Sequence, residues 1–290
     1  MIIDGKTQLV GLLGWPVSHS FSPAMHNAAA LALSLNWAYV PLPVQAQDLA
    51  AALAGLPVLG FRGVNVTVPH KQNVMPFLDK IEAGAQLIGA VNTILINPVS
   101  TGAGHKWLLS GTNTDWLGFL ADLQANEVHV EQRDCLVLGA GGSARAVVYA
   151  LVQAGAHVHV LARRLGQAEH LAVDFHEVGI VHPGSLADLA AFASDLVAPL
   201  LVNCTPLGMT PEVDRSVWPD NLPFPRDAIA YDLVYNPKQT RFMQQALAGG
   251  CRTSNGLGML VHQGALAFKV WTNHNPDIEV MRSALDMALA

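Results

Sequence analysis

A glycine-rich segment near the middle of the chain constrains the fold most strongly. Residues 139–144 read Gly-Ala-Gly-Gly-Ser-Ala, follow the apolar run Cys135–Leu138 and precede a stretch with helical periodicity. In this strand–turn–helix context a GxGxxA pattern is typical of dinucleotide binding. Gly139 permits the tight turn, Gly141 lets the backbone approach a pyrophosphate, and Ala144 allows close packing of helix on strand. The segment therefore predicts a Rossmann-like unit whose helix N-terminus receives the pyrophosphate.

The end of the next predicted strand indicates which dinucleotide is bound. An NAD-binding unit places Asp or Glu there, where the carboxylate accepts a hydrogen bond from the ribose 2′-hydroxyl. Here the strand over residues 157–162 is followed by Arg163 and Arg164. Guanidinium groups bind phosphate oxygens in bidentate fashion, so the pair favours the 2′-phosphate of NADP. The alternative interpretation is a solvated basic turn.

Strands and helices alternate along most of the chain, which predicts an α/β fold with parallel strands. Expected strands cover residues 9–14, 37–44, 60–68, 88–96, 135–138, 157–162, 200–203 and 228–233. Expected helices begin at Ser22 and Ala46, the second ending at Gly55. We expect two domains with a cleft between them, over residues 1–115 and 116–255. The strand-free segment 256–290 is expected to form helices that pack back on the first domain.

Composition excludes several classes of protein. With 290 residues, 51% hydrophobic and 13% charged, the chain can fill two cores and is not of the disordered type. Its net charge is −6 and its 16 Lys and Arg residues are scattered, so no nucleic-acid partner is expected. No apolar run reaches the ~18 residues of a membrane helix. The first six residues include Asp4 and no apolar stretch, so no signal peptide is expected.

Cysteine and histidine usage points to a reducing compartment and to no metal. Cys135, Cys204 and Cys251 are odd in number and far apart, which indicates no disulfide framework and favours the cytoplasm. The 12 histidines include no HExxH pattern, and the cysteines form no CxxC pair, so no metal site is predicted.

Hydroxyl groups gather before the first expected helix. Ser18, Ser20 and Ser22 fall within five residues, immediately before Pro23. Hydroxyls both donate and accept hydrogen bonds, so they suit a polyhydroxylated or carboxylate ligand. The alternative interpretation is that Ser22 caps the helix, which accounts for one of the three serines.

Three further polar clusters lie in the first segment. Residues 65–71 read Asn-Val-Thr-Val-Pro-His-Lys, and alternation would bring Asn65, Thr67 and Lys71 to one end of the sheet. A lysine there can donate a proton or act as an electrostatic clamp. Residues 89–93 and 111–115 add amides, hydroxyls and the carboxylate of Asp115, which is expected to pair with Lys71. The alternatives are a solvated lysine at a strand end and a helix cap at Asp115.

Taken together, these segments resemble the shikimate dehydrogenase family over nearly the whole chain. Eight motifs in family order carry the resemblance, and together they are far more specific than any one alone. They lie at residues 19–23, 65–71, 89–93, 113–115, 139–142, 203–209, 231–237 and 256–263.

The resemblance implies reversible, NADPH-dependent reduction of 3-dehydroshikimate to shikimate, on the route to chorismate and the aromatic amino acids. Lys71 matches the family's catalytic lysine, and Asp115 matches its carboxylate partner. The residues that match substrate contacts are Ser20, Ser22, Thr67, Asn92, Asp115, Tyr235 and Gln263. Those that match cofactor contacts are Gly139, Ala140, Gly141, Gly142, Ser143, Arg163, Arg164, Leu233 and Gly256, with Thr205 near the nicotinamide ribose.

The chain departs from the family pattern at two places. The usual Asn-Arg-Thr after the second Rossmann strand is Ala162-Arg163-Arg164, which loses an amide and gains a charge that favours NADP. An acidic residue often found on the cofactor side aligns with Ala83, and the adjacent Glu82 supplies it only if the alignment slips by one residue. The Ser20-Phe21-Ser22 stretch has the form of family members that select shikimate.

Two alternatives to this function remain open. One is a quinate/shikimate dehydrogenase that uses NAD or both cofactors, which an acid near Arg163 would support. The other is a non-catalytic shikimate-binding regulatory homologue, against which the retained Lys71 and Asp115 count. Small molecules are the expected partners, with a monomer or homodimer as the assembly and aminoshikimate still open as a substrate.

Overall fold

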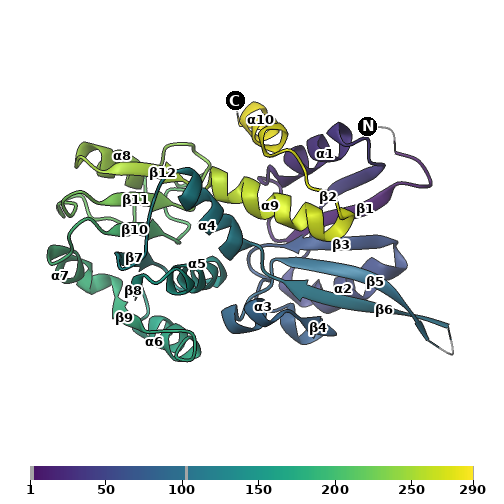
Figure 1. Ribbon diagram of the computed structural model, residues 1–290, viewed down its shortest axis with the longest axis horizontal. Helices are drawn as coiled ribbons and strands as arrows, with labels where there is room; N and C mark the ends of the chain where they lie inside the picture. The colour runs from purple at the N-terminus through teal and green to yellow at the C-terminus, as the bar shows by residue number, and fades with distance from the viewer. Residues whose placement is uncertain (1–2, 102–103, 290) are drawn as a thin grey trace. The chain divides into compact units, whose positions relative to one another are not determined.

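Each of two units is built around its own six-stranded sheet in the computed structural model, which describes residues 3–101 and 104–289 (Figure 1). Unit 1 comprises Met1–Thr114 and Val261–Ala290, and unit 2 comprises Asp115–Leu260. The predicted α/β class is confirmed. The second segment of unit 1 begins at Val261, within a continuous helix, and this boundary lies five residues after the one predicted at residue 256. Met1 and Ile2, from the start of the N-terminal segment considered above, lie outside the described residues.

The sheet of unit 1 mixes parallel and antiparallel strands in the order β2-β1-β3-β5-β6-β4. β1 pairs in parallel with both β2 and β3, whereas β5 is antiparallel to β3 and to β6. The strands are β1 (Gln8–Gly14), β2 (Trp37–Pro43), β3 (Phe61–Val66), β4 (Lys80–Ile81), β5 (Thr93–Thr101) and β6 (Gly104–Thr112). Neither β4 nor β6 is among the predicted strands. The β5–β6 ladder brings Thr112 opposite Thr93, so two of the polar clusters lie side by side.

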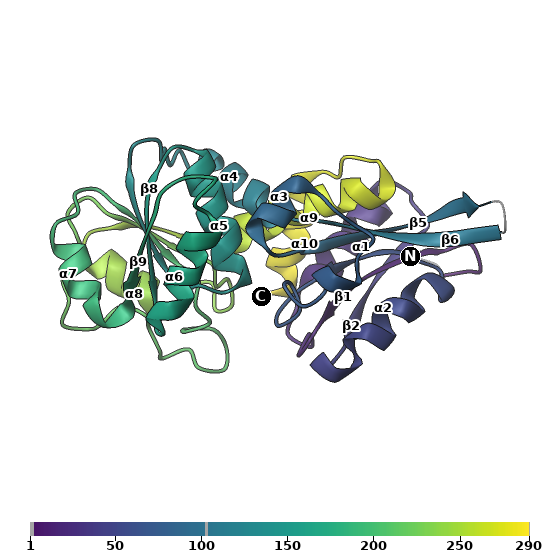
Figure 2. The ribbon, with the colours of Figure 1, turned by 90° about the horizontal axis from the view of Figure 1, so that it is seen from below.

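Helices cover both faces of this sheet. They are α1 (Ser22–Ala32), α2 (Leu49–Val58), α3 (Ala83–Ile88), α9 (Leu257–Thr272) from Val261 onward, and α10 (Ile278–Ala288). Alternation along β1 sends Val10 and Leu12 into a core with Trp271 of α9, and Leu13 into another with Leu53 of α2. Figure 2 shows α2 and α9 on opposite faces. Burial on both faces accounts for the continuously apolar stretch from Leu9 to Gly14 in β1.

Several element boundaries in unit 1 differ from the prediction, and two of the differences have a clear physical reason. The helix expected to end at Gly55 is a 3₁₀ turn followed by α2, which continues to Val58. Burial of Leu53 and Leu56 outweighs the cost of a helical glycine, about 1 kcal/mol. The strand expected to begin at Ile88 is also wrong there, because Ile88 is the last residue of α3. Gly89 then stops that helix in the left-handed region at φ 67°.

Unit 2 is a parallel, doubly wound sheet of the Rossmann type. Its strand order is β12-β11-β10-β7-β8-β9, so the order reverses at β7, between β10 and β8. The strands are β7 (Asp134–Leu138), β8 (His157–Ala162), β9 (Val181–Ser185), β10 (Leu200–Asn203), β11 (Ile229–Asp232) and β12 (Arg252–Asn255). Ligands of such folds bind at the carboxyl ends of the strands beside the reversal. The reversal therefore places the glycine-rich turn after β7 at the expected binding edge.

Helices lie on both faces of this second sheet. They are α4 (Asp115–Ala125), α5 (Gly142–Gln153), α6 (Leu165–Asp174), α7 (Leu189–Ser194) and α8 (Arg241–Ala248). Figure 2 shows α4, α5 and α6 on one face and α7 and α8 on the other. The prediction missed the two edge strands β9 and β12, because their sequences are polar and β9 contains Pro and Gly. None of the described helices is long and apolar enough to cross a membrane.

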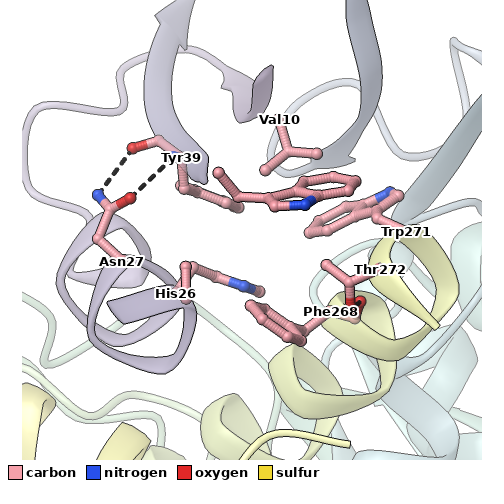
Figure 3. Close-up of a pocket in the computed structure, with 9 residues that line it drawn as sticks. Val10, His26, Asn27, Tyr39, Phe268, Trp271 and Thr272 are labelled. Carbon is pink, nitrogen blue, oxygen red and sulfur yellow. Dashed lines mark hydrogen bonds between the residues drawn. The ribbon is translucent and has the colours of Figure 1, made fainter. Parts of the chain in front are cut away.

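A buried histidine gives the core of unit 1 an acid-sensitive element. His26 stacks on Tyr39 with ring centroids 4.2 Å apart, and its other ring neighbours include Phe268 and Trp271 (Figure 3). Its ring nitrogens have no hydrogen-bond partner among the described residues. Burial lowers the pKa of His26 from 6.5 to about 3, so the folded protein holds a neutral ring.

This histidine should make the protein less stable in mild acid. Between pH 8 and pH 5 the unfolded chain protonates His26 while the folded protein does not, so stability falls as the pH drops below 6.5. The slope approaches 1.4 kcal/mol per pH unit, which amounts to about 2 kcal/mol at pH 5. In urea unfolding, the His26→Phe variant should not show this loss of stability between pH 6.5 and pH 5. The exposed control His274→Phe should still show it. Identical pH profiles for wild type and His26→Phe would contradict the assignment.

Candidate active site

Two of the three clustered serines form a hydroxyl pair at the start of α1. Helix α1 begins at Ser22, and no side-chain hydrogen bond caps it, so the interpretation of Ser22 as a helix cap is wrong. Instead the Ser20 hydroxyl donates to Ser22 Oγ at 3.3 Å, and Ser20 Oγ lies 3.3 Å from the Ser22 amide. Ser22 is buried and Ser20 is half-buried. Both hydroxyl oxygens therefore lie together at one point of unit 1.

Asn92 is the centre of a buried amide network in the same unit. Its Oδ1 accepts from the Thr114 amide at 2.7 Å and from the Thr93 hydroxyl at 3.0 Å. Its Nδ2 donates to Thr114 Oγ1 at 2.9 Å and to Gln263 Oε1 at 3.2 Å. The structure thus brings together two predicted substrate residues, Asn92 and Gln263, from distant parts of the sequence.

Lys71 and Thr67 follow β3 and are anchored to neighbouring segments through the backbone. The Lys71 carbonyl accepts from the Val91 amide at 2.7 Å, directly beside Asn92. The Thr67 amide donates to the Leu13 carbonyl at 2.9 Å. A Cβ added to Gly14 would lie 2.3 Å from Thr67 Cγ2, so Gly14 makes room for this side chain. Both Lys71 and Thr67 are half-buried.

Asp115 and the acidic position of α3 occupy different units. Asp115 is the buried first residue of α4 and belongs to unit 2, so its pairing with Lys71 stays a prediction. Glu82, in unit 1, precedes α3, and its carboxylate accepts from the Thr112 hydroxyl at 2.5 Å. Glu82 and Ala83 are both exposed, and which of them serves the cofactor stays a prediction.

The turn after β7 has the backbone of a phosphate cradle. Gly139 has φ +115°, a conformation that only glycine adopts readily, and its amide donates to the Leu161 carbonyl at 2.8 Å. A Cβ there would lie 3.2 Å from the Cys204 carbonyl. A Cβ on Gly141, the N-cap of α5, would have no atom within 4 Å. The first amides of α5, including those of Gly142 and Ser143, therefore begin beside open space, which fits a pyrophosphate.

Three further cofactor candidates cluster around Asn203 at the same edge of the sheet. The Thr205 hydroxyl donates to Asn203 Oδ1 at 2.7 Å, and its methyl group would lie 3.3 Å from a Cβ on Gly139. The Leu233 amide donates to the Asn203 carbonyl at 3.0 Å. A Cβ on Gly256 would lie 2.1 Å from the Leu233 carbonyl oxygen, so only glycine allows this contact.

Sequence reasoning missed the buried pair that holds this edge together. Asp232 accepts from Asn203 Nδ2 at 2.9 Å, from the Thr240 hydroxyl at 2.6 Å and from the Val234 amide at 3.0 Å. Burial raises the pKa of Asp232 to about 6. The sequence offered one signal for this pair: Asn203 and Asp232 are the polar residues that end the otherwise apolar strands β10 and β11.

The remaining candidates lie near the same edge. Arg163 and Arg164 directly follow β8, two and three residues beyond the Leu161 carbonyl that binds the Gly139 amide, and both are exposed. Tyr235 follows β11, and burial raises its pKa to about 12, so its phenol stays protonated and can donate. Ala140 lies within the cradle itself.

Three segments of the chain match domains of known protein families. Residues 12–94 match the shikimate dehydrogenase substrate binding domain, 127–253 a putative NAD(P)-binding domain, and 256–285 the shikimate 5′-dehydrogenase C-terminal domain. The chain is 43% identical to the shikimate dehydrogenase (NADP(+)) of Carboxydothermus hydrogenoformans over 99% of its own length and 100% of that protein. The chain belongs to the shikimate dehydrogenase family. The resemblance seen in the eight motifs is thereby confirmed.

Solved structures of this family share the fold over the whole chain. Shikimate 5-dehydrogenase of Thermus thermophilus, in complex with NADP(H) and shikimate, is 39% identical, with 98% and 100% of the two chains covered and a TM-score of 0.83. Quinate dehydrogenase of Corynebacterium glutamicum, in complex with NAD, is 30% identical, with 97% and 99% covered and a TM-score of 0.85. Proteins with this fold therefore differ in substrate and in cofactor. The substrate and cofactor preference of this dehydrogenase depends on its own site residues.

All three cysteines are free thiols, and Cys135 and Cys251 are buried. Within residues 3–101 and 104–289, no group of three or more His, Cys, Asp or Glu side chains is arranged to hold a metal ion.

Proposed function

We propose that this protein is an NADP-dependent shikimate dehydrogenase that interconverts 3-dehydroshikimate and shikimate. The observation that carries the proposal is full-length identity of 43% to an NADP(+)-dependent shikimate dehydrogenase. Lys71 and Asp115 are both present, and an arginine pair follows β8 where an NAD enzyme would carry an acid. Mixing the protein with shikimate and NADP should increase absorbance at the reduced-nicotinamide band. No increase at any protein concentration would refute the proposal.

Unit 2 is the proposed NADP domain. Gly139, Gly141 and the first amides of α5 would hold the pyrophosphate, and the two arginines after β8 would hold the 2′-phosphate. Thr205 would lie near the nicotinamide ribose, and Leu233 and Gly256 would also contact the cofactor. When bound, NADP supplies the acceptor or donor of hydride at C4 of its nicotinamide.

Unit 1 is the proposed substrate domain. The hydroxyls of Ser20 and Ser22 would bind the shikimate carboxylate, and Thr67, Asn92 and Gln263 would bind the ring hydroxyls. Tyr235, a residue of unit 2, would also donate to the substrate from its protonated phenol. The neutral amides and hydroxyls of this set match a ligand whose hydroxyls both donate and accept.

Lys71 is the proposed acid–base group. During oxidation the reacting hydroxyl of shikimate would lose its proton to the Lys71 amine, and during reduction the ammonium would return it to the developing alkoxide. Asp115 would orient the lysine and stabilise its ammonium form, which forms during oxidation and donates the proton during reduction. The backbone bond from Val91 to Lys71 fixes the position from which the side chain extends.

The quinate alternative is favoured by the similar fold of a quinate dehydrogenase in complex with NAD. The Ala162-Arg163-Arg164 end of β8 offers no carboxylate for an NAD ribose, which counts against it. A regulatory homologue without turnover is the second alternative, and the retained Lys71 and Asp115 count against that. Turnover measured over shikimate, quinate and aminoshikimate, each with NADP and NAD, separates all three.

We also propose a cytoplasmic enzyme that acts on small molecules as a monomer or homodimer, with neither nucleic acid nor membrane as a partner. The free, widely spaced thiols and the scattered basic residues support this assignment. Light scattering of the purified protein distinguishes the two assemblies.

Cofactor choice should depend on Arg163. A charge-assisted hydrogen bond contributes about 1.5–3 kcal/mol, so Arg163→Ala should weaken NADP binding roughly 10- to 100-fold and leave NAD nearly unchanged. The exposed Arg226, remote in sequence from β8, provides the control Arg226→Ala, which should affect neither cofactor. Equal losses for NADP and NAD in Arg163→Ala would contradict a role in binding the 2′-phosphate.

A further inference from the structure

We infer that Tyr39 is a positioning residue for substrate binding: together with the Thr114 amide, its buried hydroxyl orients the Asn92 side chain, acting through Asn65 and Thr93. The inference rests on the proposed function, in which Asn92 binds a hydroxyl of shikimate. None of the sequence motifs includes Tyr39. Its role emerges only from the contacts that β2, β3 and β5 make in unit 1.

Both the backbone and the ring of Tyr39 are held in place. Helix α1 holds its backbone, because Asn27 Nδ2 donates to the Tyr39 carbonyl at 3.0 Å and Asn27 Oδ1 accepts from the Tyr39 amide at 2.8 Å. The ring stacks on His26 with an interplanar angle of 2° and lies near Trp271 (Figure 3). The adjoining cavity is only about 10 Å³, room for about a single water molecule. The ring is therefore held in place, with its hydroxyl beside Asn65.

The Tyr39 hydroxyl completes the hydrogen bonding of Asn65. It donates to Asn65 Oδ1 at 2.9 Å, and Asn65 is buried. Asn65 Nδ2 in turn donates to the Asn92 carbonyl and to Thr93 Oγ1, both at 3.1 Å. A carbonyl oxygen can only accept a hydrogen bond, so the NH₂ group of Asn65 must face the Asn92 carbonyl. The side-chain oxygen of Asn65 must then face Tyr39.

The hydrogen bond from Asn65 Nδ2 limits the directions in which the Thr93 hydroxyl proton can point. That hydroxyl has a single proton, and its oxygen already accepts from Asn65. The proton can go to Asn92 Oδ1 at 3.0 Å or to Thr114 Oγ1 at 3.4 Å, and Asn92 Oδ1 is the nearer acceptor. Together with the Thr114 amide, which donates to the same Oδ1 at 2.7 Å, this bond keeps Asn92 Nδ2 facing Thr114 Oγ1 and Gln263. One donor-to-acceptor series therefore runs from Tyr39 to two proposed substrate residues.

Removing the hydroxyl should disturb this series at its first step. In Tyr39→Phe the stacked ring remains, but Asn65 Oδ1 becomes a buried acceptor without its donor, which favours other orientations of Asn65 and Asn92. We expect the KM for shikimate to rise about 5- to 10-fold, with less than about a twofold change in kcat and in the KM for NADP. A merely structural loss would instead lower the amount of active enzyme and leave KM unchanged.

A double-mutant cycle tests the route. The variants are Tyr39→Phe, Asn92→Ala and the pair, with Tyr149→Phe as a matched control, a buried tyrosine on α5 of unit 2. If Tyr39 acts through Asn92, Tyr39→Phe should change kcat/KM for shikimate less than about twofold in the Asn92→Ala background. Additive losses, or an equal rise in KM for Tyr149→Phe, would overturn the inference.

A second variant covers the case in which Tyr39→Phe does not fold. Thr93→Val removes a hydroxyl further along the series with little change in shape, and the same cycle with Asn92→Ala should show the same loss of effect. An additive result there also overturns the inference. Wild-type protein that binds and oxidises no shikimate overturns both the proposed function and this inference, whereas an active wild type with additive variants overturns this inference alone.

Discussion

Replacing Lys71 with methionine is expected to lower kcat for shikimate oxidation by about 100-fold or more, the usual contribution of a positioned acid–base group. Methionine keeps most of the length of the side chain and removes the amine, so the reacting hydroxyl loses its proton acceptor. NADP affinity should change little, because the proposed cofactor residues belong to unit 2 and Lys71 belongs to unit 1. Single-turnover kinetics with saturating shikimate and NADP measure the chemical step directly.

The exposed Lys80 provides the matched control for this prediction, since Lys80→Met removes the same charge from β4 of the same unit. Its turnover should equal that of the wild type. Near-normal turnover of Lys71→Met would make Lys71 a solvated strand-end residue and would refute the proposed acid–base step.

Shikimate should exceed quinate in kcat/KM by at least about 100-fold, or roughly 2.7 kcal/mol of transition-state discrimination. The Ser20 and Ser22 hydroxyls lie 3.3 Å apart at the start of α1, where the proposed site binds the carboxylate. Quinate is saturated at the carbon that carries this carboxylate and bears an extra hydroxyl there. A buried site that leaves this hydroxyl unpaired discriminates by several kcal/mol.

Steady-state oxidation of both acids with NADP measures this preference, and two serine variants locate its origin. Ser22→Ala should lower kcat/KM for shikimate more than that for quinate, because it removes a charge-assisted bond to a well-fitted carboxylate. The exposed Ser18 is the matched control, and Ser18→Ala should leave the ratio unchanged. Comparable constants for the two acids in the wild type would favour the quinate/shikimate alternative while leaving the family and fold unaffected.

Local sequence was sufficient for those parts of the fold whose signals are local. The Gly139–Ala144 turn follows an apolar strand and starts a helix, and the structure places β7, the turn and α5 there. By contrast, β9 and β12 form because an already formed sheet offers them an edge to pair with. Their polar sequences hold no periodicity that predicts a strand.

The site divides in the same way, between residue types that a motif reveals and contacts that only packing creates. The sequence by itself determined the family, the arginines after β8 and the residues able to bind a polyol carboxylate, because each depends on residue type and order. Only the tertiary structure decided that Asn92 and Gln263 share a hydrogen bond, that Asn203 and Asp232 support the cofactor edge, and that Tyr39 supports Asn65. These contacts join segments up to 171 residues apart, and strand order and helix packing set such distances rather than neighbouring residues.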